Sequence, residues 1–238
     1  MLAHENGAAM PPVLNVHARW FFGASLVVWT DPRKLTLRLH DRVRAGEDEI
    51  RLSERFLDAA DWTDVIGPVV DIAEHGETAE LVQYRADYAE MPAFRTMLDR
   101  IGKNKPIARY GMRLDSEEKL HAYFRYFLEL IDSIKAHGFR DQRSLQGVPV
   151  PQGLMVRGRY SRRQRDIGAA LGEDGRLLRF LGGRHRTAIA QALRLPAIPV
   201  EIRLVHADWL AAEARRAERP ADQALRNWAA RNSLPEPR

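Results

Sequence analysis

One short segment holds the residues with the clearest chemical potential, Gly182-Gly183-Arg184-His185-Arg186-Thr187. Paired glycines let a backbone approach a ligand closely and adopt positive φ angles. A helix predicted over residues 184–195 would aim its unpaired amides and the positive end of its dipole at the same point. Cations in a first helical turn are unfavourable unless an anion lies beside them, and arginine binds phosphate through parallel hydrogen bonds. The segment predicts a phosphate-binding loop; the alternative is a glycine-rich turn with surface arginines.

Positive charge is concentrated around this segment. The chain has 37 basic and 32 acidic residues, which give a net charge of +5. Residues 140–186 hold 11 arginines and four acidic residues, a local balance of +7, whereas the rest of the chain sums to −2. This concentration favours an anionic partner, either a nucleotide or a nucleic-acid backbone, over a merely solvated basic loop. The run from Arg157 to Arg165 is the part that would track nucleic-acid phosphates.

Composition excludes several classes of site and protein. The chain has no cysteine, which excludes disulfides, thiolate zinc sites, iron–sulfur ligation and a cysteine nucleophile. Its eight histidines show no metal-ligand spacing, so no dedicated metal site is expected. Walker, dinucleotide-binding and Gly-x-Ser-x-Gly motifs are absent. No apolar run is long enough to span a membrane and the first residues lack a signal-peptide pattern, so we expect a cytoplasmic protein without a membrane partner.

Apolar periodicity and turn residues predict the elements that must position the segment. Residues 19–29 and 35–40 are expected to form strands, residues 52–74 two short helices split at Gly67-Pro68, and residues 89–101 a helix. Asp115 and Glu118 form a capping pair for a helix of about 22 residues that Gly138 ends. Farther on we expect a hairpin (167–171 and 177–181), the helix 184–195, a strand (198–205), and helices over 207–219 and 220–231.

The second half of the chain resembles the ParB/sulfiredoxin superfamily. Its signature, a Gly-x-x-Arg motif that opens a helix and precedes "Leu…Ile-Pro-Val", is similar to Gly183-Arg184-His185-Arg186-Thr187 followed by Leu195 and Ile198-Pro199-Val200. Upstream, the stretch from Leu130 to Gln142 resembles the superfamily's "Leu…Ser-Ile…Gly…Gln" segment. The hairpin with Asp174-Gly175 falls where that fold has one. The resemblance covers residues 114–210.

The resemblance implies a fold and an organisation of the chain. The fold class is α/β (α+β), a small mixed sheet with helices, preceded by a mostly helical N-terminal region. We expect a flexible leader over residues 1–19, an N-terminal region of mixed strand and helix over 20–112, the ParB/sulfiredoxin-like domain over 113–212 and a C-terminal helical tail over 213–238. Residues 1–110 match no family that we can name.

The resemblance also implies nucleotide binding at the Gly-x-x-Arg loop. Sulfiredoxins have their catalytic cysteine where this chain has Arg184, so that activity is excluded. Chromosome-segregation members bind CTP and add a helix-turn-helix DNA reader, and no such reader is visible downstream. Other members are kinases that phosphorylate free serine. We therefore expect a nucleotide-binding phosphotransferase acting on a small hydroxylated metabolite, with ATP, ADP or CTP and Mg²⁺ bound through Gly182, Gly183, Arg184, His185, Arg186 and Thr187.

The acidic residue of this site is the open point of the sequence. Many relatives have an acidic residue before the motif glycine, and this chain has Gly182 there. Asp166, Asp174 and Glu201 are the candidate catalytic carboxylates, with Glu173 and Asp141 as further substitutes. An Asp-Gly pair in a turn is more often structural than catalytic. Two alternatives stay open, a nucleic-acid-binding or nuclease module of ParB-like type and a non-catalytic nucleotide sensor.

Overall fold

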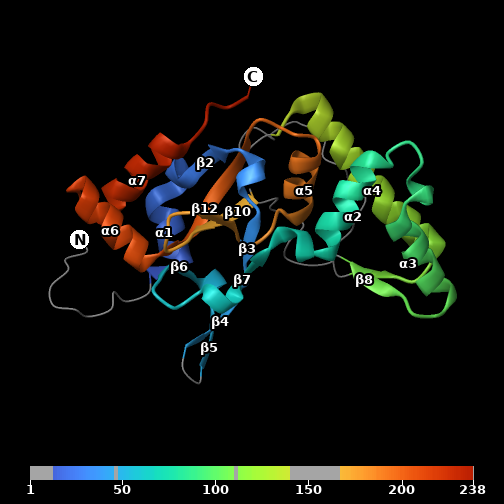
Figure 1. Ribbon diagram of the computed structural model, residues 1–238, viewed down its shortest axis with the longest axis horizontal. Coiled ribbons are helices and arrows are strands. Elements are labelled where there is room, and N and C mark those ends of the chain that lie inside the picture. Colours follow the sequence, from blue (N-terminus) through green and yellow to red (C-terminus); the bar gives the residue numbers. More distant parts are fainter. Residues whose placement is uncertain (1–12, 46–47, 110–111, 140–166, 238) are drawn as a thin grey trace. The chain divides into compact units, whose positions relative to one another are not determined.

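The computed structural model describes residues 13–45, 48–109, 112–139 and 167–237 (Figure 1). The fold is mixed α/β, with a mixed sheet, as expected. The chain divides into two compact units. Unit 1 comprises Met1–Ile72, Asp166–Gly183 and Leu195–Arg238, and unit 2 comprises Ala73–Arg165 and Arg184–Arg194. The units interleave along the chain, which differs from the linear division expected at residue 113.

Unit 1 is built on one mixed sheet of eight strands. The strand order is β1-β6-β12-β10-β11-β3-β7, and β2 also pairs with β12. Strand β12 runs parallel to β10 and β6, and β11 runs parallel to β3. The strands are β1 Val13–Leu14, β2 Val27–Thr30, β3 Leu37–Leu39, β6 Arg55–Asp58, β7 Ile66–Pro68, β10 Ile167–Leu171, β11 Leu177–Arg179 and β12 Ile198–His206.

The centre of the sheet follows from sequence composition. Strand β10 is buried at every position and β12 at nearly every position. Strands buried in this way belong in the middle of a sheet, where both faces are covered. The predicted hairpin after β10 is confirmed: the Gly175 amide donates to the Gly172 carbonyl across the turn at 2.9 Å, and Gly175 has φ +76°. These strands place the Leu181–Gly183 turn directly after β11.

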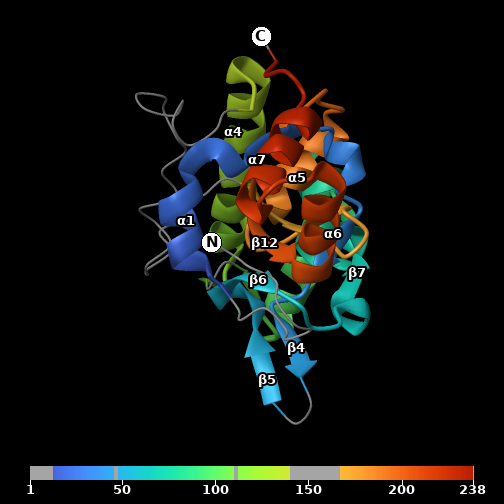
Figure 2. The ribbon, with the colours of Figure 1, turned by 90° about the vertical axis from the view of Figure 1, so that its left-hand side faces the viewer.

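The α-helices in the described part of unit 1 are α1 Asn15–Phe22, α6 Ala207–Ala217 and α7 Ala221–Asn232. Helix α7 packs against β2 and helix α6 against α7. The predicted C-terminal helices are confirmed. A two-stranded hairpin, β4 Arg42–Ala45 and β5 Asp48–Arg51, projects from the unit (Figure 2). Strand β1 and helix α1 begin within the stretch expected to be a flexible leader.

Two sequence expectations for unit 1 were wrong. Residues 19–29 were expected as one strand, but residues 15–22 form helix α1 and only Val27–Thr30 is a strand. Residues 52–74 were expected as two helices, but they hold β6, β7 and short 3₁₀ turns. Short apolar runs fit either period, and pairing with a partner strand decides between them. Strand β6 gains such a partner on each side, β12 and β1, which a single sequence does not reveal.

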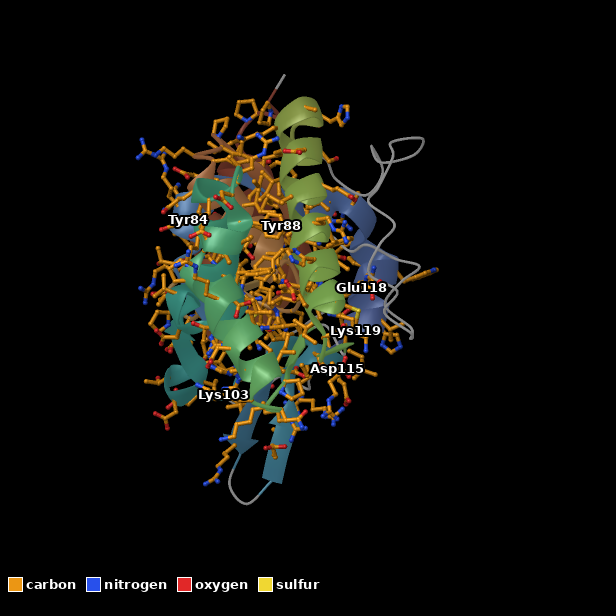
Figure 3. All side chains as sticks on the ribbon, turned by 90° about the vertical axis from the view of Figure 1, so that its right-hand side faces the viewer. Tyr84, Tyr88, Lys103, Asp115, Glu118 and Lys119 are labelled. Carbon is orange, nitrogen blue, oxygen red and sulfur yellow. The ribbon has the colours of Figure 1, made fainter. Side chains whose placement is uncertain are left out.

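Unit 2 is mostly helical. Its described elements are α2 Ala73–Gln83, α3 Pro92–Gly102, α4 Glu117–His137, α5 Arg184–Ala192 and the hairpin β8 Ile107–Arg109 with β9 Met112–Leu114. Helix α2 packs against both α4 and α5, and α3 packs against α4 (Figures 1 and 3). The predicted helices over residues 89–101 and 184–195 are confirmed with shifted ends.

Helix α4 confirms the strongest sequence prediction and corrects its cap. Its apolar stripe is buried, with Leu120, Tyr123, Phe124, Phe127, Ile131 and Ile134 inside. The N-cap is Ser116, whose hydroxyl accepts from the Lys119 amide at 3.2 Å. Asp115 instead pairs with the Lys119 ammonium at 2.6 Å (Figure 3). Of the helices that the structure describes, none, α4 included, is long and apolar enough to cross a bilayer.

The turn between β11 and α5 has an unusual backbone. Leu181, Gly182 and Gly183 have φ angles of +55°, +79° and +74°. A Cβ atom on Gly183 would lie 2.7 Å from Ile167 Cγ1, which is closer than real contacts allow. A Cβ on Gly182 would meet only the tip of Arg203, at 3.9 Å. Gly183 is therefore required by packing as well as by φ, whereas Gly182 is required by φ alone.

We predict that Gly183→Ala destabilises unit 1 by about 2–4 kcal/mol, because the left-handed backbone disfavours a side chain and the new methyl group meets Ile167. Gly67→Ala is the matched control: Gly67 has no positive φ, and a Cβ there would meet nothing within 4 Å. Urea unfolding of both variants measures the difference. Equal stability of the two variants would contradict the packing role of Gly183.

Candidate functional site

The predicted phosphate-binding segment is shared between the two units. Gly182 and Gly183 belong to unit 1, and Arg184 is both the first residue of α5 and the start of its part of unit 2. Contacts within unit 1 fix the backbone of the glycine turn, and contacts within unit 2 fix the side chains of α5.

Two buried arginines of the sheet hold the glycine turn in unit 1. Arg203 Nη1 donates to the Leu181 carbonyl at 2.8 Å, and Arg179 Nη1 donates to the Gly182 carbonyl at 3.1 Å. Arg203 also donates through Nε to the Glu201 carboxylate at 2.7 Å. Gly182 itself is exposed. Of the two glycines, only Gly182 offers the open side that close approach of a ligand requires.

The first arginine of α5 already has an anionic partner. Arg184 Nη1 donates to Glu74 Oε1 at 2.7 Å, and Glu74 lies in the first turn of α2. The Arg184 side chain is 48% exposed and that of Glu74 is 18% exposed. A cation in the first turn of a helix is unfavourable without a nearby anion, and this carboxylate supplies one. Because about half of the Arg184 side chain is exposed, its guanidinium can reach another anion from solvent.

His185 is buried and serves a different role from its arginine neighbours. Its ring is 2% exposed and stacks on the Phe127 ring of α4, with ring centres 4.1 Å apart. Its Nδ1 lies 2.6 Å from the Thr78 hydroxyl of α2. Burial, followed by the charges of Arg184, Arg109 and His75, lowers the pKa of His185 to about 3. The ring is therefore neutral at physiological pH and joins α2, α4 and α5.

Hydrogen bonding assigns the tautomer of this neutral ring. The Thr78 hydroxyl has one proton, and the hydroxyl lies 2.6 Å from the Glu74 carbonyl, to which it donates. Toward His185 the same oxygen can then only accept, so Nδ1 is the protonated nitrogen. This leaves the lone pair of the ring on Nε2. Thr78 thus connects the backbone of Glu74 in α2 to the first turn of α5.

The remaining residues of the segment differ in accessibility. Arg186 is half-buried, and its positive charge acts on the Tyr126 phenol of α4, whose pKa burial raises. Thr187 is fully buried, and within the described residues its hydroxyl has no hydrogen-bond partner. A buried hydroxyl cannot reach a ligand in solvent. Of the predicted side-chain donors, Arg184 and Arg186 are therefore the accessible ones.

A further charge pair, which is largely buried, lies on the next turn of α2. Glu77 accepts two hydrogen bonds from Arg109 of β8, at 2.5 and 3.2 Å, and Tyr123 Oη lies 3.5 Å from the same carboxylate. The hydrogen bonds from Arg109 to Glu77 raise the pKa of the guanidinium. Both side chains are largely buried. Breaking such a pair leaves an uncompensated buried charge, so this contact fixes α2 against the β8–β9 hairpin.

The predicted catalytic carboxylates do not form one group in the described structure. Asp174 is exposed in the hairpin turn, where it accepts from the Arg176 amide at 3.0 Å and pairs with the Arg176 side chain. Glu201 lies on β12 opposite Gly168 of β10. Gly168 is three residues before the end of β10, and the hairpin turn with Asp174 follows that end. That register separates the two carboxylates by at least about 10 Å. Asp166 lies outside the described residues.

Glu201 is the predicted carboxylate with a connection to the glycine turn. It pairs with Arg203 at 2.7 Å and with Arg19 at 3.4 Å, and Arg203 holds the Leu181 carbonyl. These contacts give Glu201 a structural role. Glu173 is exposed beside Asp174 in the turn. Asp141 and the basic run from Arg157 to Arg165 lie outside the described residues.

A preformed metal site is not found. Within residues 13–45, 48–109, 112–139 and 167–237, no group of three or more His, Asp or Glu side chains is placed to hold a metal ion. Magnesium, however, commonly binds through one or two carboxylates together with substrate phosphates. Glu74 is an oxygen ligand of that kind, partly exposed and held by an exchangeable arginine.

Comparison with known proteins adds no constraint. No protein-family model, no curated protein and no solved structure matches the chain.

Sequence reasoning missed the polar residues of α2 that contact α5 and the β8–β9 hairpin. Glu74, Glu77 and Thr78 are three and four residues apart, the spacing that puts side chains on one face of a helix. Their polarity was the available signal, because an inward-facing stripe of such residues is unusual. Residues 52–74 were expected as a pair of helices, so a helix that begins at Ala73 was not considered. Arg109 gave no signal, since its partner comes from another element.

The buried neutral His185 predicts a pH dependence of stability. Its pKa is about 3 in the folded protein and 6.5 in an exposed side chain, so the unfolded state binds the proton more readily. This contribution to stability is complete above about pH 6.5 and declines toward pH 3, by up to about 1.4 kcal/mol per pH unit. In His185→Asn, whose amide can still donate to Thr78, urea unfolding between about pH 6.5 and 4 should lack this slope.

Direct titration of the wild type provides the second measurement. The His185 ring signal, assigned in the NMR spectrum by its absence from His185→Asn, should not shift between about pH 8 and 5. Titration of that signal near pH 6.5 would show that the ring is solvated and would contradict the arrangement of α2, α4 and α5.

Proposed function

We propose that the chain binds a nucleoside di- or triphosphate at the start of α5 and transfers a phosphoryl group to a small hydroxylated metabolite. The observation that carries this proposal is the placement of Glu74 against Arg184, a carboxylate and a guanidinium at one helix start. Relatives in the ParB/sulfiredoxin superfamily have an acidic residue beside the motif glycine, and Glu74 of α2 supplies a carboxylate that the sequence around Gly182 lacks.

The order of elements supports the ParB/sulfiredoxin-like reading of the C-terminal half. Strand β10, the Asp174 turn, β11, the two glycines, α5 and β12 follow one another as that resemblance implies. The helix α4 precedes them, as expected from the Leu130–Gln142 segment. The order alone suits several α/β folds, so the proposed activity rests on Glu74 and Arg184.

The phosphate contacts follow from exchange of partners. When a phosphate approaches the start of α5, Arg184 can release Glu74 and donate to phosphate oxygens in its place, because about half of the Arg184 side chain is exposed. The first amides of α5 and the Arg186 guanidinium add donors on the same helix turn. Glu74 thus acts as the internal substitute for the ligand anion. The proposed contacts use residues of unit 2 only.

Release of Glu74 places a carboxylate beside the bound phosphates. It can accept the proton of the acceptor hydroxyl while the hydroxyl oxygen bonds to the terminal phosphorus and the bond to the bridging oxygen breaks. Glu74 is also the residue that would hold Mg²⁺. That ion would neutralise phosphate charge when the nucleotide brings it. The Thr78–His185 contact keeps α2 in place, so that Glu74 stays within reach of α5.

The proposal predicts opposite effects for the two partners on nucleotide binding. Arg184→Gln should weaken binding of ATP, ADP or CTP roughly ten-fold or more, because a charge-assisted hydrogen bond is lost. Glu74→Gln should keep or strengthen binding, since Arg184 no longer has a competing carboxylate, yet it should lower phosphoryl transfer about 100-fold or more. Isothermal titration calorimetry with Mg²⁺ measures binding, and release of ADP or CDP with pooled hydroxylated metabolites measures transfer.

Arg85→Gln is the matched control, because Arg85 of unit 2 also pairs with a carboxylate on the surface, that of Asp132. This variant should bind nucleotide as the wild type does. If the wild type binds none of the three nucleotides, the proposal is wrong. Binding without any transfer would leave a nucleotide sensor in place of a kinase.

A further inference from the structure

A cluster of cations lies on one face of the unit 1 sheet. Arg38 of β3 and Arg179 of β11 are direct partners in a parallel pair. Partners in a parallel pair present their side chains on the same face. His40 follows Arg38 by two residues and therefore lies on that face as well. Leu39 and Leu178 belong to the hydrophobic core of the opposite face.

The electrostatics confirm that these groups are close to one another. The pKa of His40 is lowered by its own burial and then by the charges of Arg38 and Arg179. His40 is nevertheless an exposed residue and Arg38 a half-buried one. Three basic side chains thus share one face, and two of them can be reached from solvent.

Arg38 has no counter-charge within the described part of the chain. It makes no hydrogen bond or ion pair there, and its Nε atom is buried. Gly67 faces Arg38 from β7 and contributes no side chain, and the space above Gly67 is open. A buried guanidinium nitrogen without a partner costs free energy, which a bound anion would recover.

Other well-placed arginines of unit 1 show what a structural arginine looks like in this protein. Each has a carboxylate: Arg33 with Asp31, Arg55 with Asp58, Arg203 with Glu201, and Arg216 and Arg231 with Glu213. Arg179, for its part, holds the Gly182 carbonyl. Arg38 departs from this pattern, and it does so beside two further basic groups.

We propose that Arg38, Arg179 and His40 form a binding site for a phosphoryl group. A phosphate carries two charges at neutral pH and several acceptor oxygens, which suits two guanidinium groups and an imidazole better than a single carboxylate does. The site uses residues of unit 1 only and does not depend on the proposed phosphotransfer. Free phosphate or pyrophosphate and the phosphates of a nucleotide share this chemistry.

The experiment uses the full chain, with inorganic pyrophosphate as the probe and the His40 ring as the local reporter. NMR titration follows the ring signal, assigned through His40→Asn, as pH is varied with and without pyrophosphate. A bound anion favours the charged imidazole, so pyrophosphate should raise the pKa of His40. Arg184→Gln weakens binding at α5, so a His40 response that persists in this variant comes from the site in unit 1.

Variants connect the response to Arg38. Arg38→Gln should weaken the pyrophosphate response of His40 about ten-fold, and Arg38→Lys should weaken it less, because lysine keeps the charge and loses the paired donors. Arg44→Gln is the charge-matched control: Arg44 is exposed on the β4–β5 hairpin, without a hydrogen bond or ion pair in the described structure. Thermal unfolding establishes that each variant is folded.

The outcomes separate cleanly. A raised His40 pKa whose pyrophosphate response Arg38→Gln weakens about ten-fold and Arg44→Gln preserves supports the site. Repeating the titration with ATP then tells whether the phosphates of a nucleotide use it. No change of the His40 pKa at millimolar pyrophosphate overturns the proposal, as does an equal response in Arg38→Gln. An equal response to malonate overturns the assignment to phosphate.

Discussion

The contact between Thr78 and His185 is the interaction on which the arrangement of unit 2 depends. It joins α2 to α5 inside the protein, where a polar group without a partner would be costly. Because the Thr78 hydroxyl also donates to the Glu74 carbonyl, the same side chain anchors the turn that bears the Glu74 carboxylate. The ring of His185 is also stacked on Phe127, so α4 packs against the same residue. A neutral histidine is essential here, since a charged ring would find no carboxylate among these contacts.

Because of this contact, the histidine of the Gly-Gly-Arg-His-Arg segment has a structural role that its arginine neighbours do not share. The sequence grouped six residues as a single phosphate cradle, and the structure separates them by role. Gly183 packs on Ile167, His185 and Thr187 are buried, and Arg184 is held at the surface by Glu74. Residues that lie next to one another in a helix point in directions about 100° apart. His185 is therefore turned away from the direction of Arg184 and into the interior.

Elements with a long, regular pattern were predictable from the sequence, and elements that depend on distant partners were not. The stripe from Leu120 to Ile134 identified α4, and Gly172–Gly175 identified the β10–β11 hairpin. Strand β6 was missed because its identity comes from pairing with β12, far away in sequence. For the same reason the sequence did not predict the pair between Glu77 and Arg109, because these residues meet only after α2 and the β8–β9 hairpin pack together. Local structure could thus be predicted from the sequence, whereas pairing between distant segments could not.

Charge counting shows the same limit in another form. The excess of arginine over residues 140–186 suggested a surface made for anions, yet Arg179 of that stretch donates to the Gly182 carbonyl, as Arg203, outside the stretch, donates to the Leu181 carbonyl. Those two charges act on the backbone and maintain the left-handed turn that precedes α5. Among the described residues, the cations best placed to meet a ligand are then Arg184, whose carboxylate is exchangeable, and Arg38, which lies outside the basic stretch and has no carboxylate. An arginine available to a ligand is thus one whose carboxylate partner is exchangeable or absent, and local charge density alone does not show which arginines these are.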